Sequence, residues 1–209
     1  MDRWVEAYPV LEAADPAMAA AIARTGPCPL EPAKGAGGAF GALARSICFQ
    51  QLAGAAARAI HGRFVALYDG RPTAVAVAAT PVEVMRSTGL SAAKTASIKD
   101  LADKVVDGTV KLDRWRRRRD DEIVERLSLV RGIGPWTAQM FLIFTLNRPD
   151  VWPTGDLAVR TGYGRMHDLA EPPTPRELEA LGDRYRPWRT VAAWYCWRAL
   201  DRPAAIPAP

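Results

Sequence analysis

The segment L-V-R-G-I-G-P-W-T-A, residues 129–138, holds two glycines around one apolar residue, followed by a proline. Gly132 and Gly134 can adopt the positive φ angles that other residues avoid, so they permit a tight reversal. Pro135 suits the first turn of a helix, where its missing N–H is no loss. Residues 120–129 start acidic and then carry apolar side chains at roughly helical spacing. The pattern therefore predicts a helix, a hairpin and a second helix.

This hairpin has two interpretations. Its N–H groups and those of the following helix end could bind an anion together. A corner between two helices, closed by glycine and proline, is the ordinary alternative. The ten residues alone favour the corner, and the rest of the chain reverses that preference.

The other segments predict helices and no pair of strands. Helix starts are expected at Asp15-Pro16, Ser91, Thr174 and Pro187. Residues 135–147 are apolar nearly all round, which predicts a helix buried in the centre of its domain. Residues 69–80 are expected to form a loop, because a lone strand at A-V-A-V-A-A would have nothing to pair with. The expected fold class is all-α.

The composition favours an anionic partner and a reducing compartment. The formal charge is +5 and the pI is about 9.4, and nucleic acid is the usual partner of such a basic domain. Cys28, Cys48 and Cys196 form no C-x-x-C pair, so we expect buried free thiols and no zinc or iron–sulfur site. No apolar run reaches membrane-spanning length and the N-terminus lacks a signal-peptide core, which predicts a cytoplasmic protein.

Polar residues at three places are candidates for function. Gln50-Gln51 lies between two expected helices, either as an exposed helix end or as a polar finger presented to a ligand. Asp156 has the default role of a helix N-cap, but only one apolar helix separates it from the hairpin. That helix could return the chain so that Asp156 and the hairpin share one rim. The four arginines at 116–119 are interpreted as a solvated face or linker.

Four motifs resemble the helix-hairpin-helix DNA glycosylases, most closely the alkylated-base type represented by 3-methyladenine DNA glycosylase II. They are S-I-C-F-Q-Q-L-A (46–53), G-I-G-P-W-T-A (132–138), W-P-T-G-D-L (152–157) and P-W-R-T-V-A-A-W-Y-C-W-R (187–198). They follow the family's order over almost the whole chain. The resemblance implies a compact form with two interlocked helical lobes and a cleft between them. One lobe would join residues 1–38 and 155–209, and the other would span 39–154 with the helix-hairpin-helix motif at about 120–147.

The resemblance also implies a reaction and a catalytic residue. The enzyme would flip out alkylated bases of the 3-methyladenine or 7-methylguanine type and hydrolyse their N-glycosidic bond in base excision repair. Asp156 would be the catalytic aspartate, which stabilises an oxocarbenium-like sugar or orients water onto C1′. Bifunctional relatives carry a lysine two residues after the second hairpin glycine. Trp136 stands there in this sequence, so a monofunctional enzyme is implied.

Further positions take roles from the same resemblance. Trp136 and Trp197 match aromatic pocket positions, and Met140 replaces a tyrosine found there in some relatives. Gln51 would wedge into the base stack beside Gln50. DNA phosphate would contact the positions Gly132, Ile133, Gly134, Thr137 and Arg160. The backbone carbonyls of Ser128, Val130 and Gly132 could hold Na⁺ or K⁺, and no cofactor would be required.

The expected partner is double-stranded DNA with alkylated bases, bound by a monomer that associates with the nucleoid. Two alternatives remain open. A helix-hairpin-helix module that binds DNA without catalysis would need the hairpin but neither Asp156 nor the aromatic pocket. A glycosylase for another damaged base would keep the fold and change the substrate.

Overall fold

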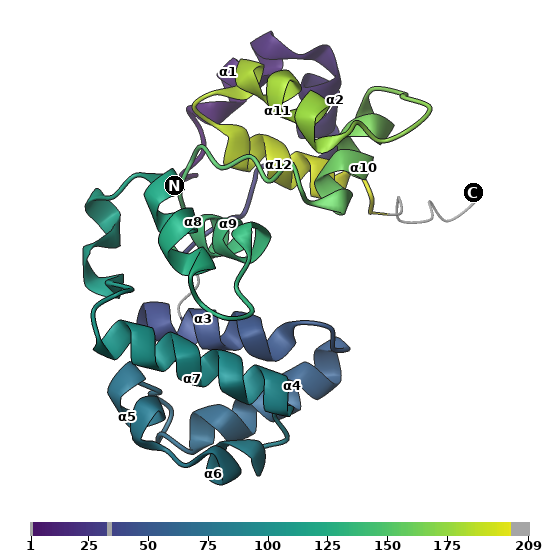
Figure 1. Ribbon diagram of the computed structural model, residues 1–209. Coiled ribbons are helices and arrows are strands. Elements are labelled where there is room, and N and C mark those ends of the chain that lie inside the picture. The colour runs from purple at the N-terminus through teal and green to yellow at the C-terminus, as the bar shows by residue number, and fades with distance from the viewer. Residues whose placement is uncertain (1, 33–34, 202–209) are drawn as a thin grey trace. The chain divides into compact units, whose positions relative to one another are not determined.

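The computed structural model describes residues 2–32 and 35–201, apart from the side chains of Arg114 and Arg116. Over these residues the chain is all-helical, as predicted, and contains no strand (Figure 1). It divides into two compact units. The terminal unit comprises Met1–Glu31 and Asn147–Pro209, and the central unit comprises Pro32–Leu146.

These boundaries fall earlier than those expected from the sequence, which lay at 38/39 and 154/155. The segment that follows Leu146 is held by the last helix of the terminal unit. The Thr190 hydroxyl donates to the Arg148 carbonyl and accepts the Val151 N–H. The Arg189 guanidinium pairs with Asp150 at 2.7 Å. The loop before Asp156 therefore belongs to the terminal unit.

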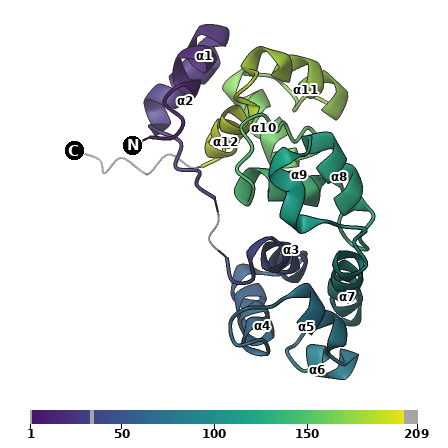
Figure 2. The same cartoon turned by 90° about the vertical axis from the view of Figure 1, so that its left-hand side faces the viewer.

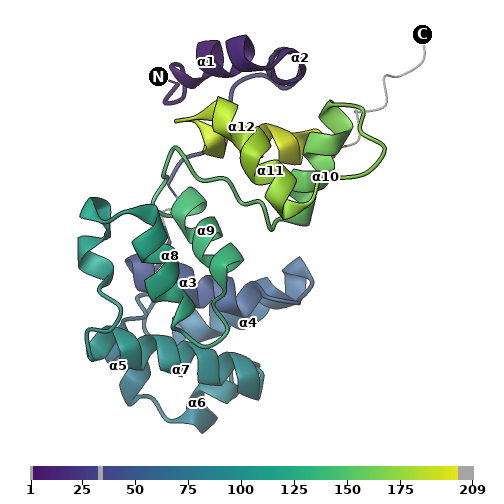
Figure 3. The same cartoon turned by 45° about the horizontal axis from the view of Figure 1, so that its top comes forward.

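The central unit is built around α7 (Figures 1 and 3). Helix α7 packs against α5 and α3, α3 also packs against α4 and α9, and α8 packs against α9. The elements of this unit are α3 (Gly38–Phe49), α4 (Gly54–Ala66), α5 (Ala74–Ala79), α6 (Val82–Arg86), α7 (Ala92–Val106), the 3₁₀ helix η1 (Leu112–Arg117), α8 (Asp120–Ser128) and α9 (Pro135–Phe144).

The terminal unit is built around α12, which lies between α2 and α10 in Figure 2. Every residue from Arg189 to Cys196 of this helix is buried. The elements of this unit are α1 (Ala7–Ala14), α2 (Pro16–Thr25), α10 (Leu157–Met166), α11 (Pro175–Gly182), the 3₁₀ helix η2 (Asp183–Tyr185) and α12 (Arg189–Arg198).

Several predicted helix starts are confirmed by their caps. The Asp15 carboxylate accepts the Ala17 N–H at the start of α2, and the Ser91 hydroxyl accepts the Lys94 N–H at the start of α7. Thr174 and Glu177 form the reciprocal capping box that opens α11. Each cap satisfies N–H groups that a helix end leaves unpaired.

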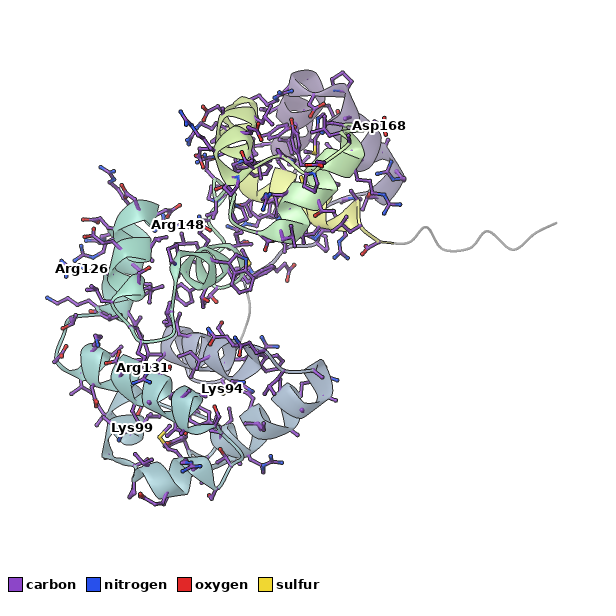
Figure 4. All side chains as sticks on the ribbon, turned by 45° about the vertical axis from the view of Figure 1, so that its right-hand side comes forward. Lys94, Lys99, Arg126, Arg131, Arg148 and Asp168 are labelled. Carbon is purple, nitrogen blue, oxygen red and sulfur yellow. The ribbon has the colours of Figure 1, made fainter. Side chains whose placement is uncertain are left out.

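The prediction of a loop over residues 69–80 was wrong, because α5 occupies Ala74–Ala79. The Thr73 hydroxyl caps its start by accepting the Ala76 N–H. At its other end, the Lys99 ammonium of α7 donates to the carbonyls of Val77 and Thr80 at 3.2 and 3.0 Å. Lys99 is labelled in Figure 4. A cation at a helix C-terminus also suits the helix dipole, so tertiary packing completes this short helix.

Helix α9 was expected to be buried all round, and it is buried on one face only. Thr137, Ala138 and the run Phe141–Ile143 are buried, whereas Trp136 and Phe144 are 48% and 38% exposed. The apolar residues near the two ends of α9 are thus partly accessible.

The three cysteines are free and buried, as predicted. Burial raises the pKa of the Cys28 thiol to about 12 and that of Cys48 to about 11, so both stay protonated at neutral pH. None of the helices within residues 2–32 and 35–201 is long and apolar enough to span a membrane.

Candidate functional site

The hairpin between α8 and α9 turns on one left-handed residue. Gly132 has a φ of +76°, as its sequence predicts. Gly134 does not share this conformation, since it is the extended N-cap of α9 with a φ of −96°. The Ile133 side chain is buried beneath the turn. The backbone N–H of Ile133 donates to the Val130 carbonyl at 3.0 Å.

Backbone donors are left available at the tip of this hairpin. The N–H groups of Arg131 and Ile133 are used, by the Asp100 carboxylate and the Val130 carbonyl. The exposed Gly132 and Gly134 donate through their N–H groups to no atom of the described residues. No side chain among the described residues caps the N-terminus of α9. Such an uncapped end beside free N–H groups favours an anionic ligand.

Gln50 and Gln51 border a hollow of about 670 Å³ in the central unit. The Gln50 amide donates through Nε2 to the Gly132 carbonyl at 2.9 Å, which ties the loop after α3 to the hairpin. Gln51 is exposed and has a φ of +53°, a strained conformation for a residue other than glycine. The lining residues of the hollow are Ser46, Phe49, Gln50, Gln51, Gly132, Trp136, Thr137 and Met140.

Two residues of this hollow, Ser46 and Phe49, were not singled out from the sequence. Phe49 is the last residue of α3 and lies directly before the glutamine pair. The Arg45 guanidinium lies over its ring at 4.2 Å from the ring centre. The motif S-I-C-F-Q-Q could have indicated Phe49, because this residue directly precedes the candidate ligand-binding residues Gln50 and Gln51.

Asp156 is a buried carboxylate in the terminal unit, with 7% of its surface exposed. It is the N-cap of α10, as its default role predicts, and Oδ1 accepts the Val159 N–H at 2.9 Å. The Trp197 indole directs its Nε1 donor to the same oxygen from α12, at 3.4 Å. Two donors thus orient a carboxylate that has little contact with water.

Three of the candidate arginines, Arg118, Arg119 and Arg160, have partners within their own units. Arg160 donates through Nε to the Pro173 carbonyl at 2.6 Å. In the run 116–119, Arg118 pairs with Glu122 at 3.6 Å and Arg119 pairs with Asp121. These ion pairs fit the interpretation of the run as a solvated face, although the Arg116 side chain lies outside the described residues.

Backbone carbonyl oxygens that could coordinate a monovalent cation are present at the hairpin. The carbonyls of Val130 and Gly132 each accept one hydrogen bond, from Ile133 and Gln50, which leaves each a second lone pair. These hard oxygens therefore fit Na⁺ or K⁺. The described side chains contain no group of three or more His, Cys, Asp and Glu residues that could hold a metal ion.

Comparison with known proteins identifies the family. A model of the HhH-GPD superfamily of base excision DNA repair proteins matches residues 44–187. The chain belongs to the HhH-GPD superfamily. The resemblance predicted from the four sequence motifs is thereby confirmed.

Relatives in this superfamily support the same assignment. DNA-3-methyladenine glycosylase 1 of Schizosaccharomyces pombe is 38% identical over 75% of this chain and 70% of its own length. A solved structure of the S. pombe 3-methyladenine DNA glycosylase in complex with abasic DNA matches 93% of this chain and 96% of its own chain, with 34% identity and a TM-score of 0.79. A DNA-3-methyladenine glycosidase structure from Bacillus halodurans matches 92% of this chain and 88% of its own, with 28% identity and a TM-score of 0.84.

Proposed function

We propose that this protein is a monofunctional DNA glycosylase that flips out alkylated bases and hydrolyses their N-glycosidic bonds. The observation that carries the proposal is the buried Asp156 carboxylate, held by the Val159 N–H and faced by the Trp197 indole N–H. Relatives named for 3-methyladenine excision support the substrate class. Base excision repair is the reaction sequence in which such an enzyme acts.

Asp156 is the catalytic residue of this proposal. As an anion it stabilises the positive charge that develops on the sugar when the glycosidic bond breaks, or it orients the attacking water. A carboxylate fixed by donors in a buried place needs little reorganisation for this task. An alkylated purine already carries a positive charge that weakens the bond, so the reaction does not require a strong general acid.

The aromatic side chains would hold the damaged base. An electron-rich indole face attracts a cationic base by about 0.5–2 kcal/mol. We assign this role to Trp136, which lines the hollow of the central unit with Met140. Trp197, to which the resemblance gives a pocket position as well, faces Asp156 within the terminal unit. Trp136 also stands where a lyase would need lysine, and we therefore propose hydrolysis without strand cleavage.

The hairpin would grip the DNA backbone. The N–H groups of Gly132 and Gly134, with that of Thr137 at the start of α9, would approach a phosphate. The Ile133 N–H is held by the Val130 carbonyl, so this residue would contribute only the shape of the turn. Arg160 of the terminal unit would make a phosphate contact of its own. Gln51 would enter the base stack vacated by the flipped nucleotide, with Gln50 beside it. A Na⁺ or K⁺ ion on the carbonyls of Ser128, Val130 and Gly132 would add positive charge beside that phosphate.

The partner in this proposal is double-stranded DNA that contains alkylated bases. The formal charge of +5 favours such a polyanion. We propose a monomer without a required cofactor that works on the nucleoid in the cytoplasm.

Release of 3-methyladenine and 7-methylguanine from methylated duplex DNA tests the proposal. We expect the wild type to release base and Asp156→Asn to lose at least about a hundredfold in rate, since the charge on the sugar loses its counter-ion. Asparagine is as good an N-cap as aspartate, so α10 should keep its start. Asp168→Asn, at an exposed carboxylate of the same unit, is the matched control and should retain activity.

The outcomes separate the three interpretations. Equal binding of methylated DNA by both proteins, with no base released by either, would favour a non-catalytic binding module. Release of a different damaged base from a panel of duplexes would keep the glycosylase and replace its substrate. Unchanged release by Asp156→Asn would remove Asp156 from the catalytic role.

A further inference from the structure

The hairpin packs against helix α7. Figures 1 and 3 both show the loop between α8 and α9 reaching this helix. A Cβ atom placed on Gly132 would lie 2.7 Å from the hydroxyl oxygen of Ser97, which is buried in α7. Glycine is thus required at 132 for close approach as well as for its positive φ. The contact with α7 therefore fixes how close the hairpin backbone lies to this helix.

One turn further along α7, Asp100 holds the backbone of the hairpin. Its Oδ2 accepts the Arg131 N–H at 2.8 Å, although the two residues are far apart in the sequence. Its Oδ1 pairs with the Lys104 ammonium, one helical turn away. Burial raises the pKa of Asp100, but the hydrogen bonds from Lys104 and the Arg131 N–H outweigh it, so the pKa lies below its usual value. The carboxylate is ionised at neutral pH.

We propose that Asp100 is a positioning residue for the hairpin: by accepting the Arg131 N–H it fixes the turn so that the Gly132 and Gly134 N–H groups stay available for a DNA phosphate. The inference rests on the proposed function, in which the hairpin N–H groups bind a DNA phosphate. Four consecutive residues divide their donors accordingly. Arg131 and Ile133 donate inward, to Asp100 and Val130, while the exposed Gly132 and Gly134 keep theirs.

Lys104 is the second part of this device. A bare carboxylate beside a phosphate-binding loop would repel the DNA backbone. The Lys104 ammonium neutralises the Asp100 charge and leaves its second oxygen to hold the Arg131 peptide. Asp100 thus supplies a strong, charge-assisted hydrogen bond without a net negative charge near the hairpin.

Substitutions at these two positions separate the hydrogen bond from the charge. The measurements are the dissociation constant for an undamaged duplex, KM and kcat for base release, and the thermal unfolding midpoint. We expect Asp100→Ala to raise the dissociation constant and KM about tenfold with kcat within about twofold. Asp100→Asn keeps an oxygen that can accept the Arg131 N–H, so it should restore most of the affinity. Asp103→Ala, at an exposed aspartate of the same helix, is the matched control.

Lys104→Met leaves the carboxylate uncompensated while its bond to Arg131 remains. We expect this variant to weaken DNA binding several-fold at low salt and to approach the wild type at high salt, because screening removes the repulsion. If Asp100→Ala fails to fold, the salt dependence of DNA binding by Lys104→Met still tests the proposal.

The proposal is overturned if Asp100→Ala leaves both KM and the dissociation constant unchanged, or if kcat falls as much as the affinity does. An effect of Lys104→Met that is independent of salt would also contradict it. A wild type that binds duplex DNA but releases no base would refute the proposed reaction alone. The dissociation constants would then still test Asp100.

Discussion

At the scale of single residues, Trp136 bears on which chemistry this site can perform. It follows Gly134 by two positions, in the first turn of α9, and it lines the hollow beside Gln50. We predict that Trp136→Lys creates no lyase activity, because an amine nucleophile also needs a lowered pKa and a neighbouring group to move protons. Borohydride trapping on a duplex with an abasic site would measure covalent protein–DNA product.

A trapped product from Trp136→Lys at the level of a bifunctional control enzyme would show that this one position is sufficient. Trp136→Phe is the informative partner variant, since it keeps an aromatic face in the hollow. It should retain base release where Trp136→Lys loses it, because a lysine ammonium repels a cationic base. Equal release by the two variants would argue against stacking at this position.

Residue-level prediction from the sequence succeeded where a role depends on neighbours in the chain. The N-cap role of Asp156 follows from the apolar helix that begins after it, and the structure confirms this role. The bond from Gln50 to the Gly132 carbonyl joins residues 82 positions apart, so no local pattern announces it. The Trp197 donor that faces Asp156 lies 41 positions away in the sequence, so it is not visible in a local pattern either. The catalytic, wedge and phosphate-binding roles stay predictions.

At the scale of helices, Gly162 allows α10 and α12 to cross closely. A Cβ atom at this position would lie 1.8 Å from the Cys196 carbonyl oxygen of α12. We predict that Gly162→Ala lowers the free energy of unfolding by about 1–3 kcal/mol or more, since the helices must separate. Gly62→Ala replaces a helical glycine whose added Cβ would meet no neighbouring atom of the described residues within 4 Å, so it should instead stabilise by about 0.5–1 kcal/mol. Urea unfolding of both variants tests the pair, and equal changes would contradict the crossing as the cause.

Asp15 joins three elements of the terminal unit. It caps α2, and its Oδ2 accepts a hydrogen bond from the Tyr185 hydroxyl of η2 and faces Nε2 of His167, after α10, at 2.8 Å. Burial raises the pKa of Asp15, but the hydrogen bonds from Tyr185 and His167 outweigh it, so the pKa lies below its ordinary value. A lowered carboxyl pKa stabilises the fold above the unfolded-state value of about 4, and this stabilisation is lost as pH falls through the folded-state value.

We therefore predict that Asp15→Asn costs about 1–3 kcal/mol of unfolding free energy at pH 7 and less at pH 3, because the stabilisation from a lowered carboxyl pKa declines once the pH falls below the unfolded-state value of about 4. Asparagine preserves the N-cap of α2, so the difference reports the charge. Denaturant unfolding at the two pH values measures it. A cost that stays constant between pH 7 and pH 3 would mean that the shape of the side chain matters and its charge does not.

Helix prediction failed where the stabilising partner is distant. Residues 74–79 alternate alanine and valine and carry no helical stripe, yet they form α5. The carbonyls at the end of α5 bind Lys99, which follows in a different helix. Caps that lie next to their helix, as at Ser91 and Thr174, were by contrast readable from the sequence. Tertiary contacts can override weak local preference, and their partners are not visible in a local window.

At the scale of the whole molecule, the family was predictable because four motifs occur in the family's order along the chain. The unit boundaries were harder to place. The bonds that hold residues 148–151 come from Arg189 and Thr190, about forty positions later. The net charge follows directly from the sequence, but it does not identify which Lys and Arg side chains contact DNA.

The salt dependence of DNA binding identifies those cations. Each phosphate neutralised by Lys or Arg contributes about −0.9 to the slope of log affinity against log salt, whereas a neutral N–H contributes no such charge. Arg131 is exposed at the hairpin, while Arg119 is already paired with Asp121. We predict that Arg131→Gln reduces the magnitude of the slope by about one and that Arg119→Gln leaves it unchanged. Titration of a labelled duplex at several salt concentrations measures both. A slope reduced by Arg119→Gln would assign the arginine run to the DNA interface, because an arginine that releases a counter-ion on binding cannot be fully compensated by its own neighbour.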